Sequence, residues 1–183
     1  MQTKSFQDRP APKELRNKPI YKSVLAIDPG FDRMGIAILE GIKGKESVLF
    51  SECISTSVRD KHGVRLRQIG NRINEIIRTW KPEDLAIEKL FFNQNAQSAM
   101  GVAEARGVAL YEAANAGLTI YEYSPQDVKI AVTGYGRATK KDVLGMMQRL
   151  ITFHKDNCLD DEIDAIAIGL THFAHQSIRD IHR

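Results

Sequence analysis

Cysteine is scarce in this 183-residue chain, which contains only Cys53 and Cys158. Two thiols so far apart in sequence do not suggest a disulfide framework, so we expect a protein of the reducing cytoplasm. Long hydrophobic runs are lacking too, and the first residues lack the apolar core of a signal peptide, so no membrane segment is expected. A hydrophobic content of 43% and a charged content of 27% are ordinary for a globular domain with a substantial core.

Positive charge is concentrated in the first twenty residues. The chain has a net charge of +3, and residues 1–20, with five basic and two acidic residues, account for all of it. Pro10, Pro12 and Pro19 also lie there, so we expect a basic, mostly disordered arm followed by a single domain over residues 21–183. The prolines and acids argue against a mitochondrial presequence. Because the remaining residues are balanced in charge, DNA binding by the domain would depend on local basic patches.

The segment 24–39 predicts two strands that meet at a tight turn. Residues 24–27 form a short, β-prone apolar run of the kind that becomes a buried strand. The run ends in Asp28-Pro29-Gly30, which is turn chemistry, and apolar residues resume at Met34. Asp28 therefore lies at the end of a buried strand. A carboxylate is unfavourable there unless a cation or another partner compensates its charge.

A second buried strand, over residues 84–88, also ends in a carboxylate, Glu88. Further strands are predicted at 47–57 and 118–123, and helices at 65–80, 95–116, 125–132, from about 140, and 160–177. This order of elements indicates an α/β fold, a mixed five-stranded sheet flanked by helices. The helix at 65–80 carries basic residues mostly off its apolar face, and we expect them to be exposed to solvent: Arg65, Arg67, Arg72 and Arg78.

The last predicted helix adds Asp161 and Asp164. Their spacing of three places them on one helix face, about 60° apart around the axis and about 4.5 Å along it. With Asp28 and Glu88 they make four carboxylates, and each close pair costs on the order of 4 kcal/mol. Divalent cations remove this penalty, and oxygen ligands favour Mg²⁺ or Mn²⁺ over zinc. Two such ions about 4 Å apart can clamp a phosphodiester, one activating water and one stabilising the leaving oxygen.

Simpler roles for these acids stay open at this point. Asp160, Asp161 and Glu162 could cap the last helix and interact with its dipole, and Asp28 could be a turn residue. Glu88 and Asp164 have apolar neighbours and need a partner, which could be arginine or lysine. Structural or surface roles are expected for four residues whose spacing fits no standard zinc site: His154, Cys158, His172 and His175.

Four motifs in order are more specific than any one of them. They are Ala26-Ile-Asp-Pro-Gly30 with Gly35, Ala86-Ile-Glu-Lys-Leu-Phe91, Asn95-Ala-Gln-Ser-Ala99 with Ala105-Arg-Gly107, and Asp161-Glu-Ile-Asp-Ala-Ile-Ala-Ile168 with Thr171-His172. Over residues 22–176 the chain resembles the RuvC family of Holliday-junction resolvases, which have the RNase H-like fold. The resemblance implies that Asp28, Glu88, Asp161 and Asp164 are catalytic ligands of two Mg²⁺ ions. It also implies a homodimer that nicks opposed strands of four-way junction DNA during recombination and repair.

The resemblance further implies contacts to DNA. Phe91 matches an aromatic residue used near the junction bases, and Lys129 and Lys140 match residues that bind the substrate backbone. Lys140 follows a glycine-rich loop at a helix start, where it could steady the scissile phosphate. Arg137 and Lys141 are expected to be further phosphate contacts. The branch-migration proteins RuvA and RuvB are the partners that the resemblance suggests.

Other functions were weighed against this one. An RNase H-like nuclease acting on RNA or an RNA/DNA hybrid would use the same carboxylates. A junction-binding module without catalysis would not need all four acids, which are present here. The turn at residues 28–35 also resembles the phosphate loop of the actin–hexokinase ATPases, but those proteins need a duplicated fold and this chain holds one copy.

Overall fold

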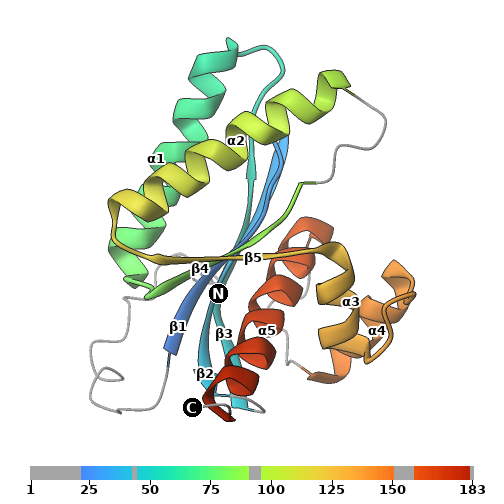
Figure 1. The fold of residues 1–183 in the computed structure, drawn as a ribbon. Helices are drawn as coiled ribbons and strands as arrows, with labels where there is room; N and C mark the ends of the chain where they lie inside the picture. The colour runs from blue at the N-terminus through green and yellow to red at the C-terminus, as the bar shows by residue number, and fades with distance from the viewer. Residues whose placement is uncertain (1–21, 43–44, 91–95, 151–158, 182–183) are drawn as a thin grey trace, which may run out of the picture.

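The structure, a computed structural model, describes residues 22–42, 45–90, 96–150 and 159–181. A five-stranded sheet in the order β3-β2-β1-β4-β5 lies between two groups of helices (Figure 1). Strand β1 pairs antiparallel with β2 and parallel with β4, so the predicted mixed sheet is confirmed. The strands are β1 (Lys22–Asp28), β2 (Arg33–Ile42), β3 (Lys45–Ser55), β4 (Asp84–Glu88) and β5 (Thr119–Tyr123). The helices are α1 (His62–Trp80), α2 (Ala96–Asn115), α3 (Pro125–Thr133), α4 (Lys140–Leu150) and α5 (Asp160–Ile181).

The two faces of the sheet are covered by different helices. Leu25 and Ile27 of β1 point into a core formed with α1 and α2. Val24 and Ala26 point to the opposite face, into a core formed with α3, α4 and α5. Side chains alternate along a strand, so Asp28 belongs to the face that α5 covers. Burial on both faces explains why the strand reads as a continuous apolar run.

Local sequence sets the helix ends that the site depends on. Helix α3 begins with a capping box: Ser124 Oγ accepts a hydrogen bond from the Asp127 backbone N–H at 3.1 Å, and Asp127 Oδ2 accepts one from the Ser124 N–H at 2.7 Å. Pro125 follows at the first helical position. Helix α1 ends at Lys81, whose φ of 50° is left-handed, and Pro82 prevents continuation.

The expectation that Arg65 is exposed is wrong. Only 8% of its side chain is exposed, and its guanidinium lies 3.8 Å from the centre of the Phe31 ring. Its Nε donates a hydrogen bond to Thr56 Oγ1 at 2.8 Å, and the guanidinium forms an ion pair with Asp32. Arg65 therefore fixes the turn between β1 and β2 on α1, because residues outside the helix cover its polar face.

Candidate active site

The ends of β1 and β4 bring the first two predicted acids together. The parallel register pairs Ala26 with Ala86 and Ile27 with Ile87, and one further step sets Asp28 beside Glu88. Ala86 lies in the core on the α5 side, so alternation puts Glu88 on that side as well. Both carboxylates thus face α5 at the C-terminal ends of these two strands.

The first two turns of α5 supply the other two acids, Asp161 and Asp164. The first turn lies directly on β2 at Gly35, where an added Cβ would be only 1.8 Å from the Asp161 carbonyl oxygen. Glycine is therefore required at this crossing. The register pairs Gly35 with Asp28, so the crossing also brings the start of α5 over the end of β1.

The buried acid in this turn of α5 has a structural role. Glu162 is only 1% exposed, and its Oε2 accepts a hydrogen bond from Ser51 Oγ at 2.6 Å. Its Oε1 accepts one from the Leu159 backbone N–H at 3.3 Å. These contacts agree with the helix-capping role considered from the sequence, and they add an anchor to β3.

The electrostatics of Asp28 and Glu88 are strongly perturbed. Burial first, and then the charges of Glu88 and Asp164, raise the pKa of Asp28 from 3.8 to about 8. Burial also raises the pKa of Glu88, while its hydrogen bond with Asp28 opposes that rise. Asp161 adds to the rise in the pKa of Asp28, so the other three acids all lie within electrostatic range of Asp28. At neutral pH the pair at the strand ends therefore retains a proton.

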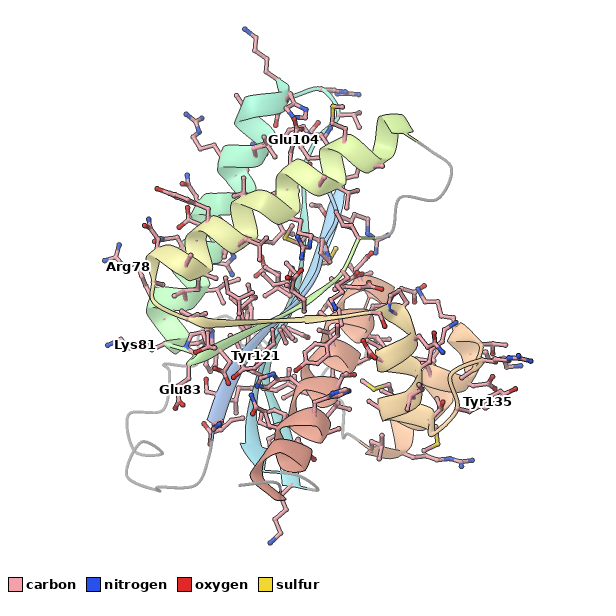
Figure 2. The ribbon with its side chains drawn as sticks, in the orientation of Figure 1. Arg78, Lys81, Glu83, Glu104, Tyr121 and Tyr135 are labelled. Carbon is pink, nitrogen blue, oxygen red and sulfur yellow. The ribbon has the colours of Figure 1, made fainter. Side chains whose placement is uncertain are left out.

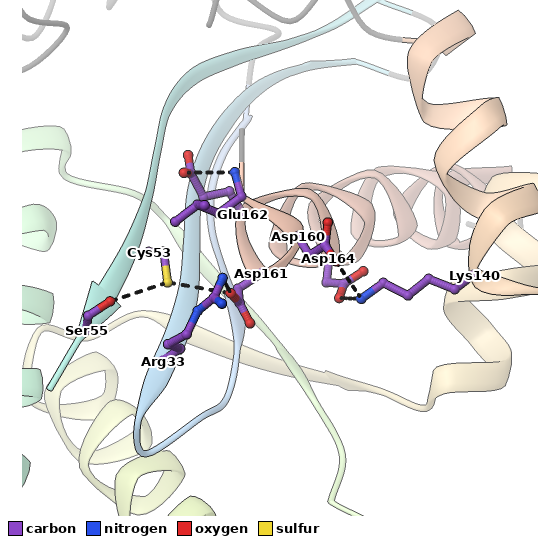
Figure 3. A network of polar contacts seen from close by, with 9 residues as sticks. Arg33, Cys53, Ser55, Lys140, Asp160, Asp161, Glu162 and Asp164 are labelled. Atoms are coloured by element: carbon purple, nitrogen blue, oxygen red, sulfur yellow. Dashed lines mark hydrogen bonds and ion pairs between the residues drawn. The ribbon is translucent and has the colours of Figure 1, made fainter. Parts of the chain in front are cut away.

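Two cations approach the α5 acids from different sides (Figure 3). Arg33 at the start of β2 forms an ion pair with Asp161. Lys140 at the start of α4 places its Nζ 2.9 Å from Asp164 Oδ2 and 3.9 Å from Asp160 Oδ2. The thiol of Cys53 on β3 lies 3.6 Å from Asp161 Oδ2. A proton and two side-chain cations thus offset the negative charge of this site.

The four carboxylates are suitable ligands for divalent cations, although in this structure they share a proton or contact Arg33 and Lys140. Within the described residues, no three His, Cys, Asp or Glu side chains are grouped so that they could hold a metal ion. Asp161 and Asp164 instead form ion pairs with Arg33 and Lys140. Four acidic oxygen donors, one with a pKa raised to about 8, are what a hard divalent cation compensates well.

The remaining predicted residues fall into three groups. Lys140 is at the site, as its contact with Asp164 shows. Lys129 on α3 is half-buried, and Arg137 and Lys141 near the start of α4 are exposed. Phe91 lies outside the described residues. Arg33 was missed by the sequence analysis, although its place inside the Asp28–Gly35 turn was a signal that could have found it.

The helix that carries Asp161 and Asp164 also has a buried polar residue near its middle. His172 is fully buried, in agreement with the structural role expected for it. Its Nε2 lies 3.0 Å from Asp84 Oδ2 and its Nδ1 lies 3.0 Å from the Tyr123 hydroxyl. These contacts tie α5 to the beginning of β4 and the end of β5.

Comparisons with known proteins identify the family that this sequence matches. A family model described as "Crossover junction endodeoxyribonuclease RuvC" matches residues 24–172. Proteins of that name from Moorella thermoacetica and Alkaliphilus metalliredigens are 40% and 42% identical over 149 residues, which cover 81% of this chain and 89% and 91% of theirs.

Solved structures extend the likeness to the fold. T. thermophilus RuvC in complex with a Holliday junction substrate superposes with a TM-score of 0.80 and 30% identity, covering 87% of this chain and 96% of that one. The yeast mitochondrial Holliday junction resolvase Ydc2 has a TM-score of 0.64 at 14% identity, covering 88% and 84%, and supports the fold alone. Among the helices in the described part of the chain, none has the length and hydropathy that a membrane crossing requires.

Proposed function

Since the chain belongs to the RuvC family of crossover junction endodeoxyribonucleases, we propose that Asp28, Glu88, Asp161 and Asp164 are the catalytic carboxylates with which it cuts four-way DNA junctions. The protein is a Holliday junction resolvase of recombination and repair. The proposed reaction is hydrolysis of one phosphodiester in each of two opposed strands, leaving a 5′-phosphate and a 3′-hydroxyl.

The observation that carries this proposal is the convergence of strand ends and α5 on one cluster of acids. Asp28 and Glu88 end neighbouring parallel strands, and the close crossing at Gly35 adds the α5 acids. Such a cluster opposes folding unless something offsets its charge. Its retention at one edge of the sheet, with a pKa of about 8 for Asp28, is typical of a functional site.

The cations that fit are two Mg²⁺ ions per site, with Mn²⁺ as an alternative, held by Asp28, Glu88, Asp161 and Asp164. When bound, divalent ions supply Lewis-acid chemistry, which lowers the pKa of water and offsets charge on the phosphate oxygens. The protein's own contribution is to position these acids on two strand ends and one helix. Asp28 and Glu88 must release their shared proton for all four acids to act as ligands.

Basic residues around this cluster suit the DNA backbone. Lys140 already contacts an anionic oxygen of Asp164, and in the loaded site the same ammonium group is in place to steady the scissile phosphate. We propose Arg137, Lys141 and Lys129 as further phosphate contacts, and Phe91 as the contact to junction bases. Two active sites, from a homodimer of the domain at residues 21–183, would account for paired nicks.

The cellular setting follows from this substrate. Chromosomal junctions would place the protein in the cytoplasm, where the branch-migration proteins RuvA and RuvB are its proposed partners. The basic arm at residues 1–20 lies outside the described residues, and we propose that it is separate from the nuclease domain.

The test is cleavage of a synthetic four-way junction with Mg²⁺, beside a linear duplex and an RNA/DNA hybrid of the same sequence. Paired symmetric nicks in the junction alone are expected. Cleavage of the hybrid instead would assign the site to RNA, and tight junction binding without cleavage would indicate a non-catalytic module.

A matched pair of variants tests the assignment of the acids. Asp164→Asn should abolish cleavage while junction binding in Ca²⁺, measured by gel shift, is retained. Asp160→Asn makes the same chemical change about one helical turn before Asp164, at a side chain that is 75% exposed. It should cut within about twofold of the parent, because its carboxylate lies outside the proposed ligand set. Equal loss of cleavage in both variants would contradict the assignment.

A further inference from the structure

The sheet fixes the position of Arg33 beside the active site. Arg33 pairs with Ser55 of β3, and Gly35, two residues later, pairs with both Asp28 and Cys53. Alternate residues of a strand share a face, so Arg33 lies on the face that α5 covers. Its guanidinium forms an ion pair with Asp161, and the Cys53 thiol lies 3.6 Å from the same Asp161 carboxylate (Figure 3). Strand pairing therefore fixes the backbone of Arg33.

The ion pair between Arg33 and Asp161 is held more weakly than the ion pair between Arg65 and Asp32. Half of the Arg33 side chain is exposed, whereas only 8% of the Arg65 side chain is, and Arg65 has a stacking partner as well as an acid. A half-exposed ion pair typically changes an equilibrium by no more than roughly fivefold. A divalent cation can therefore displace this guanidinium from Asp161, whereas Arg65 is built to stay in place.

We propose that Arg33 exchanges one anion for another during the reaction cycle. In the metal-free protein it neutralises Asp161, and once a cation occupies the carboxylates it binds a phosphate of the DNA strand. The inference rests on the proposed function of these acids. Displacement leaves a half-exposed guanidinium next to the reacting strand, and its planar fork matches two phosphate oxygens. Lys140 and Asp164 form the corresponding contact from α4.

The first half of the test is a titration with Mn²⁺ alone, without DNA, followed by calorimetry. Arg33→Ala should bind Mn²⁺ about two- to fivefold more tightly than the parent, because no side-chain cation competes for Asp161. Arg33→Lys should remain near the parent value. The control is Arg78→Ala, which removes one cation from the last turn of α1 (Figure 2). The first residue of α1, His62, packs on Phe31 and is about four turns away from Arg78. Arg78→Ala should leave the affinity unchanged.

The second half is junction binding in Ca²⁺ over a range of salt concentrations. Arg33→Ala should bind more weakly, and the slope of log K against log salt should fall by about one, as expected for the loss of one phosphate contact. Arg33→Lys should keep the slope. Opposite signs in the two titrations are the signature of the exchange, because a merely structural role would weaken both.

Two results would overturn the role of Arg33: Mn²⁺ affinity in Arg33→Ala that is equal to or weaker than the parent's, or an unchanged salt slope. Failure of the underlying function has a different signature. In that case Asp164→Asn would bind Mn²⁺ as well as the parent does, whatever happens at Arg33.

Discussion

Replacing Asp28 by asparagine should stabilise the metal-free protein at alkaline pH. The pKa of Asp28 is about 8 in the folded chain and 3.8 ordinarily, so folding favours its protonated form. Between these values the folded state binds a proton that the unfolded state has lost, and the free energy of unfolding falls as pH rises. The full shift corresponds to about 6 kcal/mol at 1.36 kcal/mol per pKa unit. Because the amide must find new hydrogen-bond partners, we expect a gain of about 2–4 kcal/mol at pH 8.

The assay is urea denaturation in EDTA at pH 5, 6.5 and 8, followed by the fluorescence of the single tryptophan, Trp80. The parent should lose stability steadily from pH 5 to pH 8, and Asp28→Asn should show a much smaller trend. Asp160→Asn is the control, because its exposed carboxylate should leave the pH trend of the parent intact.

Added Mg²⁺ provides an internal check on the same curves. At a hundred times its dissociation constant, a ligand that binds only the folded state adds about 2.7 kcal/mol to stability. The parent should gain this stabilisation and Asp28→Asn should gain less, since it lacks one proposed ligand. A flat profile for the metal-free parent between pH 5 and pH 8, or an Asp28→Asn variant less stable than the parent at pH 8, would refute the reasoning.

Three further predictions follow from the same contacts. Gly35→Ala should reduce cleavage at least tenfold and lower stability by about 1–3 kcal/mol, measured by junction nicking and urea denaturation, because its Cβ collides with the Asp161 carbonyl. The affinity for Mn²⁺, measured by calorimetry at pH 6, 7 and 8, should rise up to about tenfold per pH unit, because binding must release the proton held by Asp28. His172→Ala should cost about 2–4 kcal/mol in urea denaturation, since it leaves a cavity and removes the buried hydrogen bond to Asp84.

The acids were predictable from the sequence because their placement depends on local pattern. Asp28 and Glu88 can be recognised because each ends a short apolar run typical of a buried strand. Asp161 and Asp164 can be recognised because their spacing of three residues places them on one face of a helix. The position of these acids at the strand ends and in the first turns of α5 is as expected.

The arginines were not predictable, because their partners are distant in sequence. A helical wheel shows that Arg65 lies off the apolar stripe of α1, but it does not show that Phe31, Asp32 and Thr56 cover that side. Arg33 depends on the register between β2 and β3 and on the crossing of α5, neither of which leaves a periodic signal in the sequence.

Helix α5 carries the acids in its first turns and its anchoring contacts in its middle, and this division helps to explain how the acid cluster is tolerated. In the middle of the helix, Gly169 packs on Leu39, and His172 bridges Asp84 of β4 and Tyr123 of β5. These contacts are buried and hydrogen-bonded, so they fix the helix without any help from the acids. Because β4 carries Asp84 at one end and Glu88 at the other, fixing α5 at Asp84 also sets its first turn over Glu88. In the metal-free protein, the proton on the Asp28–Glu88 pair and the contacts of Arg33 and Lys140 then limit the repulsion among the four acids.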